Sequence, residues 1–109
     1  MRFERKVTGD NFDLVALLPE VLPKAGEELK VTFQIRSKTA PHTRLTLAFF
    51  VDGQEISSLK GVVPPYQTAS ADFTWRAKAG RHRLGAKLSS ALKVVIETWE
   101  AKIEIPPKG

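Results

Sequence analysis

A cluster of basic side chains in the C-terminal half of the chain has the clearest capacity for chemistry. The cluster consists of Arg76, Lys78, Arg81, Arg83 and Lys87. In an extended strand, residues two and six positions apart share a face, so the last three of these would form one row of cations. Such a row could contact phosphates or an acidic glycan.

A neighbouring strand could neutralise this row. If the last strand lies beside it, Glu100, Lys102 and Glu104 are its outward residues, and each cross-strand pair of opposite charge contributes roughly 0.2–1 kcal/mol. A balanced, solvated sheet face is then the simpler interpretation, and a polyanion or nucleic-acid interface is the alternative. Nucleic acid is the less favoured partner, because neither an RNA-binding signature nor a run of stacking aromatics accompanies the charge.

Two aromatic residues are further candidates for contact with a partner. Phe50 would point outward if Phe49 and Val51 point inward. An outward ring can seed a protein contact, or it can lie over the stems of neighbouring Lys and Arg side chains. Tyr66 follows two prolines in a loop, where it could form part of a sugar-binding platform together with an exposed tryptophan.

The sequence contains no recognisable catalytic set. His82 alternates with Leu84 and Leu88, which predicts an inward position at the rim of the core with a hydrogen-bonded ring. There is no nucleophile elbow, no phosphate-cradling Gly-rich loop and no metal-ligand spacing. The absence of cysteine removes thiolate nucleophiles and Cys-ligated zinc or iron–sulfur sites. We therefore expect a protein that is not an enzyme and carries no metal or cofactor.

The composition is that of one small domain. The chain has 109 residues and a net charge of +5, with charged residues of both signs spread along it. Its longest apolar runs, 14–18 and 47–51, are far shorter than the roughly 20 residues of a spanning helix, so we expect no membrane insertion. The N-terminus does not lead into an apolar stretch of signal-peptide length. One Asn, one Met and no Cys, beside abundant Lys, Glu and Arg, are compatible with a thermophilic source.

Apolar residues recur at every second position, which predicts strands with one wet face. The alternation is strict over 29–36 and recurs over 69–75 and 99–105. Asp52-Gly53 is typical of a type I′ turn and predicts a tight hairpin. Seven main strands are expected, near 13–18, 29–37, 44–51, 54–59, 68–75, 81–88 and 98–105. Residues 3–7 could add an edge strand, and 89–97 could form a short helix or part of a long final strand.

These strands predict an all-β fold, a seven-stranded antiparallel two-sheet β-sandwich of the fibronectin-III/immunoglobulin type. We expect an N-terminal segment over 1–11, the sandwich over 12–105 and a tail over 106–109. Both tryptophans fit inward positions. The expected core comprises Leu14, Val31, Phe33, Ile35, Leu47, Phe49, Val51, Phe73, Trp75, Leu84, Leu88 and Ile103.

Several short motifs occur in an order that resembles one family. The motifs are Asp13-Leu14-Val15, Pro23-Lys24-Ala25-Gly26-Glu27 before Leu29-Lys30-Val31-Thr32-Phe33, Phe50-Val51-Asp52-Gly53, Val63-Pro64-Pro65 before Ala71-Asp72-Phe73-Thr74-Trp75, and Ala79-Gly80-Arg81-His82-Arg83-Leu84. Over 12–105 the chain resembles the CARDB domain, the cell-adhesion-related domain of bacteria and archaea. The resemblance implies a fibronectin-III-like sandwich without catalytic residues, used as a module of secreted or surface proteins.

One segment departs from the family pattern. Many CARDB domains carry an acidic stretch before the last strand, whereas this chain has Leu88-Ser89-Ser90-Ala91-Leu92-Lys93 there. Calcium takes six to eight oxygen ligands, so we expect no calcium site in this loop.

The resulting functional hypothesis is a non-catalytic binding or structural module of a cell-surface or secreted assembly, with a protein or polysaccharide surface as its partner. One alternative is a polyanion or nucleic-acid binder that uses the basic sheet face, and another is a subunit of a homopolymeric fibre or virion shell. Self-association through edge strands, at 3–7 or at the last strand, is a further expectation. We expect an extracellular or surface location within a larger or processed protein, and a cytoplasmic one if Met1 is the true start of a complete chain.

Overall fold

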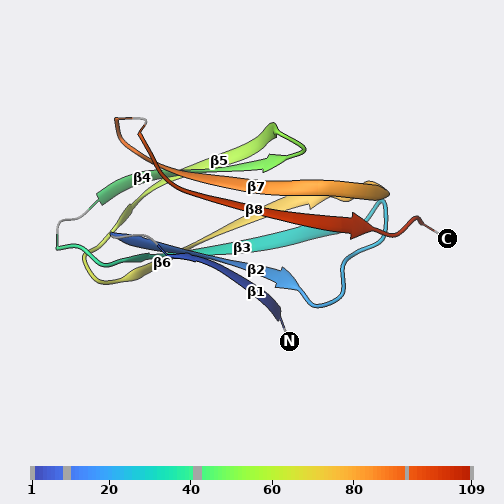
Figure 1. Ribbon diagram of the computed structural model, residues 1–109, viewed down its shortest axis with the longest axis horizontal. Coiled ribbons are helices and arrows are strands. Elements are labelled where there is room, and N and C mark those ends of the chain that lie inside the picture. Colours follow the sequence, from blue (N-terminus) through green and yellow to red (C-terminus); the bar gives the residue numbers. More distant parts are fainter. Residues whose placement is uncertain (1, 9–10, 41–42, 93, 109) are drawn as a thin grey trace.

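The computed structural model describes residues 2–8, 11–40, 43–92 and 94–108, and their regular structure is entirely β (Figure 1). The strands are β1 (Arg2–Thr8), β2 (Phe12–Pro19), β3 (Glu28–Ser37), β4 (Thr43–Val51), β5 (Gln54–Val63), β6 (Thr68–Arg76), β7 (Gly80–Ser90) and β8 (Val95–Ile105). They form two four-stranded sheets, in the orders β1-β2-β3-β6 and β5-β4-β7-β8, with antiparallel pairing throughout. The predicted two-sheet sandwich is confirmed. Within the described residues, no helix offers the length and apolar character that crossing a bilayer demands.

Strand β1 adds an eighth strand to the seven main ones expected from the sequence. It runs antiparallel to β2 from Arg2 opposite Pro19 to Thr8 opposite Asp13, and it is the edge of its sheet. The edge strand expected near 3–7 therefore lies within β1.

The stretch over 89–97, for which both a helix and a strand were open, belongs to the β7–β8 hairpin. Strand β7 continues to Ser90, and β8 begins at Val95. The N–H of Ser90 donates to the carbonyl of Val94 at 2.9 Å, and the Ser90 hydroxyl accepts from the N–H groups of Leu92 and Val94. The Ser90 hydroxyl and the Val94 carbonyl thus satisfy backbone N–H groups at this turn, and the chain reverses direction there without a helix.

The Asp52-Gly53 hairpin has the expected geometry. Asp52 and Gly53 have φ angles of 53° and 82°, and Val51 pairs with Gln54 directly across the turn. Two consecutive positive φ angles are the requirement of a type I′ turn, which Asp-Gly meets at little steric cost. The prediction of a tight hairpin at this position is confirmed.

The core lies between the two sheets and centres on Phe33 of β3. The Phe33 ring contacts Phe73 of β6 edge-on at 5.8 Å between centroids, Trp99 of β8 at 5.3 Å, and Phe49 of β4 at 6.2 Å. The rings of Phe49 and Phe73 stack on each other at 5.3 Å. Aromatic pairs at these separations add about 0.5–1.5 kcal/mol each beyond the apolar area that they bury.

The expected core residues are buried, with two exceptions. Trp75 and Ile103 are only partly buried and pack against the margin of the core, so placing them within it was wrong. The reason is their position near one end of the sandwich, where the Trp75 ring of β6 meets the His82 ring of β7 in the facing sheet edge-on, 5.0 Å away. Trp99 is 4% exposed and fills the interior as expected.

Truncation of the central ring tests this account of the core. We expect Phe33→Ala to lower the free energy of unfolding by about 3–5 kcal/mol, because the cavity removes contacts with rings from both sheets. Urea denaturation followed by tryptophan fluorescence measures the change. Thr74→Ala, at an exposed position of β6, is the control and should shift stability by less than about 0.5 kcal/mol. Equal effects of the two substitutions would contradict the central role of Phe33.

Candidate functional site

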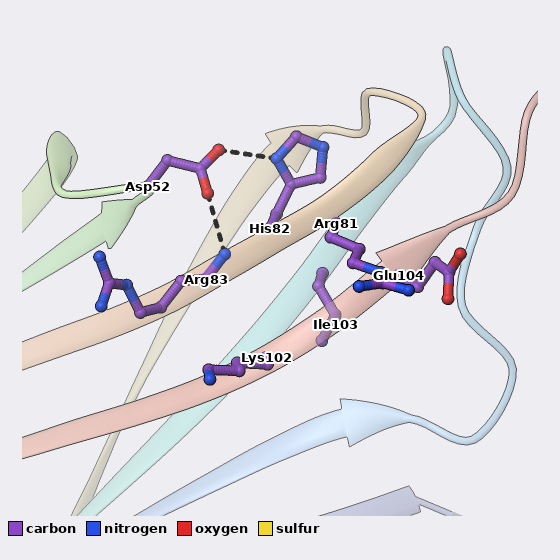
Figure 2. A pocket seen from close by; sticks show the side chains of 7 residues that line it. All are labelled: Asp52, Arg81, His82, Arg83, Lys102, Ile103 and Glu104. Carbon is purple, nitrogen blue, oxygen red and sulfur yellow. Dashed lines mark hydrogen bonds and ion pairs between the residues drawn. The ribbon is translucent and has the colours of Figure 1, made fainter.

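A cleft of about 480 Å³ opens at one end of the β5-β4-β7-β8 sheet, and Figure 2 shows its lining. The β4–β5 turn contributes one residue to it, and adjacent ends of β7 and β8 contribute the rest. We call this site the cationic cleft. It is lined by Asp52, Arg81, His82, Arg83, Lys102, Ile103 and Glu104.

Asp52 fastens the hairpin turn to β7. Its backbone N–H donates to the carbonyl of Arg83 at 2.8 Å, and its Oδ1 accepts from the N–H of Arg83 at 2.9 Å. Its Oδ2 lies 2.7 Å from Nδ1 of His82, as the dashed lines of Figure 2 show. Three bonds from one residue at a tight turn hold this side of the cleft rigid.

Both ring nitrogens of His82 face hydrogen-bond acceptors. Nδ1 is directed at the Asp52 carboxylate, and Nε2 lies 2.8 Å from the backbone carbonyl of Lys78. A neutral imidazole has one N–H and can satisfy only one of them, whereas the imidazolium donates to both. The geometry therefore favours the charged form of His82. The predicted hydrogen-bonded histidine at the rim of the core is confirmed.

The pKa values of this pair shift in the direction that the geometry requires. The hydrogen bond to Asp52 raises the pKa of His82 above its ordinary value, with help from the Lys78 carbonyl and against the effect of burial. The hydrogen bond from His82 lowers the pKa of the Asp52 carboxyl, and the backbone N–H of Arg83 acts in the same direction. Each group thus stabilises the charged form of the other.

The register of β7 and β8 leaves positive charge in the cleft. Arg83 lies opposite Lys102, which is a like-charge pair, and Arg81 lies opposite Glu104. Arg83 Nε pairs with Glu100 Oε1 at 3.2 Å. Within the described part of the chain, no ion pair within 4.0 Å joins Arg81 or Lys102 to a carboxylate.

The expected neutralisation of the basic row is therefore only partial. Glu100 neutralises Arg83, but Lys102 lies opposite Arg83 and adds a further positive charge to the row. With His82 as imidazolium, four cations face the carboxylates of Asp52 and Glu104 in the cleft lining, and Asp52 is already engaged by His82.

The structure disperses the rest of the basic cluster read from the sequence. Lys87 lies over the Phe50 ring, with Nζ 5.1 Å from the centroid, so Phe50 is covered by a lysine. Arg76, at the end of β6, donates from Nη1 to the carbonyl of Gly26 in the β2–β3 loop at 3.2 Å. Lys78 contributes its backbone carbonyl to His82, while its side chain is exposed.

Tyr66 is exposed at the opposite end of the sandwich. It lies in the β5–β6 loop with a positive φ of 56° and is 67% exposed. The sequence-based candidates thus do not form one site, because only Arg81 and Arg83 line the cationic cleft.

The sequence alone does not predict five of the residues at the site, which are Asp52, His82, Lys102, Ile103 and Glu104. The sequence predicts Asp52 as a turn residue, and Lys102 and Glu104 as outward residues of a last strand whose opposite charges neutralise much of the basic row. A signal was available in the hairpin, because an aspartate in a tight turn presents its carboxylate to the neighbouring strand. The other residues become visible only once the pairing register of β7 and β8 is known.

No group of three or more His, Asp or Glu side chains suited to a metal ion occurs in the ranges that the structure describes. Lys93, in the loop where a calcium site was not expected, lies outside those ranges.

Comparison with solved structures defines the class of fold. The CARDB domain of a Pyrococcus furiosus protein, solved in complex with di-metal ions, aligns over 94% of this chain and 100% of that domain with a TM-score of 0.75 and 11% identity. Fibronectin(III)-like modules of Clostridium thermocellum CbhA align over 98% of both chains, with a TM-score of 0.61 and 20% identity. The chain thus has a CARDB-like, fibronectin-III-like fold. No family model and no curated protein matches the sequence.

Some large glycosidases also contain a domain of this shape. A glycoside hydrolase family 2 β-glucuronidase aligns over 95% of this chain with a TM-score of 0.61 and 13% identity, but the match covers only 11% of the enzyme. The similarity therefore concerns one β-sandwich domain within that enzyme.

The His82–Asp52 pair predicts a pH dependence. In Asp52→Asn, which retains a residue that tolerates positive φ, we expect the pKa of His82 to fall toward about 6.5, as measured by NMR titration of the ring. Because the folded-state pKa of His82 is raised, its stabilisation is complete below about 6.5 and is lost as pH rises through the folded value. The contribution of Asp52, whose pKa is lowered, is present above about 3.9 and is lost as pH falls through its folded value.

The stability advantage of the wild type over Asp52→Asn should therefore be largest between these limits, as measured by urea denaturation at several pH values. Glu55→Gln removes the neighbouring hairpin carboxylate, which is exposed and makes no contact with the ring, and should leave the pKa of His82 unchanged. An unshifted His82 pKa in Asp52→Asn would show that the carboxylate does not hold the imidazolium.

Proposed function

We propose that this protein is a non-catalytic binding module of a cell-surface or secreted assembly, and that it contacts an acidic partner through the cationic cleft. The fold supports a module, since its structural neighbours are CARDB and fibronectin(III)-like domains of similar size. The match to a glycosidase supports the same proposal, because there a domain of this shape accompanies a much larger chain. No catalytic step is needed to account for any residue of the cleft.

The observation that carries the proposal is the pair of cations without ion-pair partners in the cleft. Arg81 and Lys102 project from adjacent strands and have no carboxylate within 4.0 Å among the described residues. The guanidinium of Arg81 offers a planar fork that suits a carboxylate, and the ammonium of Lys102 acts as a point charge beside it. A carboxylate-bearing polysaccharide or an acidic protein surface presents the complementary chemistry.

Rigidity is the contribution of the hairpin. Because Asp52 bonds both the backbone of Arg83 and the ring of His82, the turn and β7 move as one unit. Because the backbone of β7 is already fixed there, less ordering entropy is lost when a partner binds. The imidazolium of His82 adds charge beneath the cleft without competing for the ligand, since both its N–H groups are already engaged.

Charge reversal in the cleft tests the proposal. We expect Arg81→Glu with Lys102→Glu to weaken binding to polygalacturonate or polyglutamate by at least about tenfold, because one lost hydrogen bond to a charged group contributes about 1.5 kcal/mol. Isothermal titration calorimetry measures the affinity. Affinity of the wild type should fall steeply with added salt, as for any polyelectrolyte contact.

A double reversal of equal charge change serves as the control. Lys30→Glu with Arg44→Glu changes exposed cations on β3 and at the far end of β4, outside the cleft. This control should retain most of the affinity, if recognition is local rather than a response to net charge. Equal losses in the two double variants, or binding insensitive to salt, would contradict the assignment of the cleft.

A further inference from the structure

Strand β5 is the most weakly covered strand with described side chains. Nine of its ten residues are exposed, although its partner β4 alternates between buried and half-buried positions. It forms the edge of its sheet and pairs only with β4, as Figure 1 shows. The backbone groups on its free side are therefore available to a further strand.

A groove of about 200 Å³ runs along the same flank, where β5 faces β6 of the other sheet. Leu45, Leu47 and Ile35 from the core contribute to its lining, and Leu59 of β5 stands beside them with 45% of its surface exposed. On the β6 side the groove is lined by small residues that leave space. These are Ala69, Ser70 and Ala71.

The opposite flank of the sandwich has a hollow of its own, of about 330 Å³, between the end of β2 and β8. Strand β8 packs against β1 and β2 there, and its inward residues Trp99, Ala101 and Ile105 are buried. Strand β5 is the better candidate for strand addition, because nine of its ten residues are exposed, whereas the inward residues of β8 are mostly buried.

The exposed large apolar residues of β5 are spaced symmetrically. Ile56, Leu59 and Val62 are 40%, 45% and 49% exposed, and Leu59 lies midway between the other two. In an antiparallel pair, opposing side chains lie on the same face of the sheet. If two copies of β5 pair about Leu59, Leu59 meets Leu59 of the second copy and Ile56 meets its Val62. Lys60 then meets Ser58 of the second copy, so no like charges are opposed.

Other two-fold registers do not pair all three of these apolar residues with one another. Centring the pair on Ser58 would set Ile56 against Lys60 of the second copy and Leu59 against its Ser57. The register about Leu59 is therefore favoured by the sequence of the strand itself. Ile56 is the extra residue of a β-bulge opposite Phe49 and Phe50, so regular pairing about Leu59 spans 57–61, and the contacts between Ile56 and Val62 lie at its two ends.

We propose that the protein forms a two-fold dimer in which β5 of each copy pairs antiparallel about Leu59. The dimer has one continuous eight-stranded sheet across the two copies. Because the two-fold axis is normal to this sheet, the second sheets of both copies lie on the same side, and the two β5–β6 grooves face each other. The outer faces of the two copies also lie on the same side of the dimer. If the cleft binds an acidic polymer as proposed above, the dimer presents two binding sites to one polymer and gains avidity.

Sedimentation equilibrium over a range of protein concentrations tests the dimer. We expect the wild type to dimerise and Leu59→Glu to raise the dissociation constant by more than about tenfold, because the substitution buries two unpaired carboxylates against each other. Leu92→Glu, at a residue 86% exposed in the β7–β8 turn, should dimerise like the wild type. Circular dichroism of each variant verifies that the fold is retained.

The chain contains no cysteine, which allows the register to be read directly. In the proposed dimer, residue 59 is the only position of β5 that lies opposite itself, so Leu59→Cys should form disulfide-linked dimers on mild oxidation. Leu92→Cys lies outside the proposed interface, so it measures cross-linking by random collision and should form far fewer disulfide-linked dimers. A wild type that sediments as a monomer overturns the proposal, as does a dimer unaffected by Leu59→Glu or equal cross-linking of the two cysteine variants. These results do not decide whether the cleft itself binds, because the charge-reversal variants of the cleft test that separately, and loss of the dimer removes only the gain in avidity.

Discussion

Contact of the Phe33 ring with rings from three other strands is the interaction on which the rest of the structure depends. Its partners come from both sheets: Phe73 from β6 in its own sheet, and Phe49 and Trp99 from β4 and β8 in the facing one. A sheet with one apolar face must bury that face against another layer. Aromatic side chains supply the area for this burial in a chain without disulfides. Because β4 and β8 are placed by the same contacts, the aromatic centre also determines where their ends meet.

The cationic cleft is a consequence of that placement. Once β4, β7 and β8 are aligned, the tight turn after β4 brings Asp52 beside His82 and Arg83, although the histidine is 30 residues further along the chain. In this position the Asp52 carboxylate forms a partly enclosed ion pair with His82. The pKa of Asp52 is lowered and the pKa of His82 is raised, so both groups favour their charged forms. The residue that locks the hairpin thus also determines the charge at the floor of the cleft.

Comparison of the sequence with the structure shows which inferences are local. Alternation over 29–36 correctly predicted that Val31, Phe33 and Ile35 are buried, because the side-chain period of a strand depends only on its own backbone. The same rule placed Trp75 in the core, but its inward ring lies at the margin of the sandwich, beside the His82 ring of the facing sheet, and is only partly buried. It also treated the basic cluster as one feature. The structure assigns Lys87 to Phe50, Arg76 to the Gly26 carbonyl and only the two arginines of β7 to the cleft.

The sequence by itself determined the all-β class, the positions of the main strands, the Asp52-Gly53 hairpin and the residues that face inward, because each depends on backbone geometry over a few neighbouring residues. Only the tertiary structure decided that Arg83 lies opposite Lys102, that Asp52 meets His82, and that β5 remains an uncovered edge. These features depend on pairing register and on which strands end a sheet. Both are set by contacts between distant segments, so no short stretch of sequence contains them.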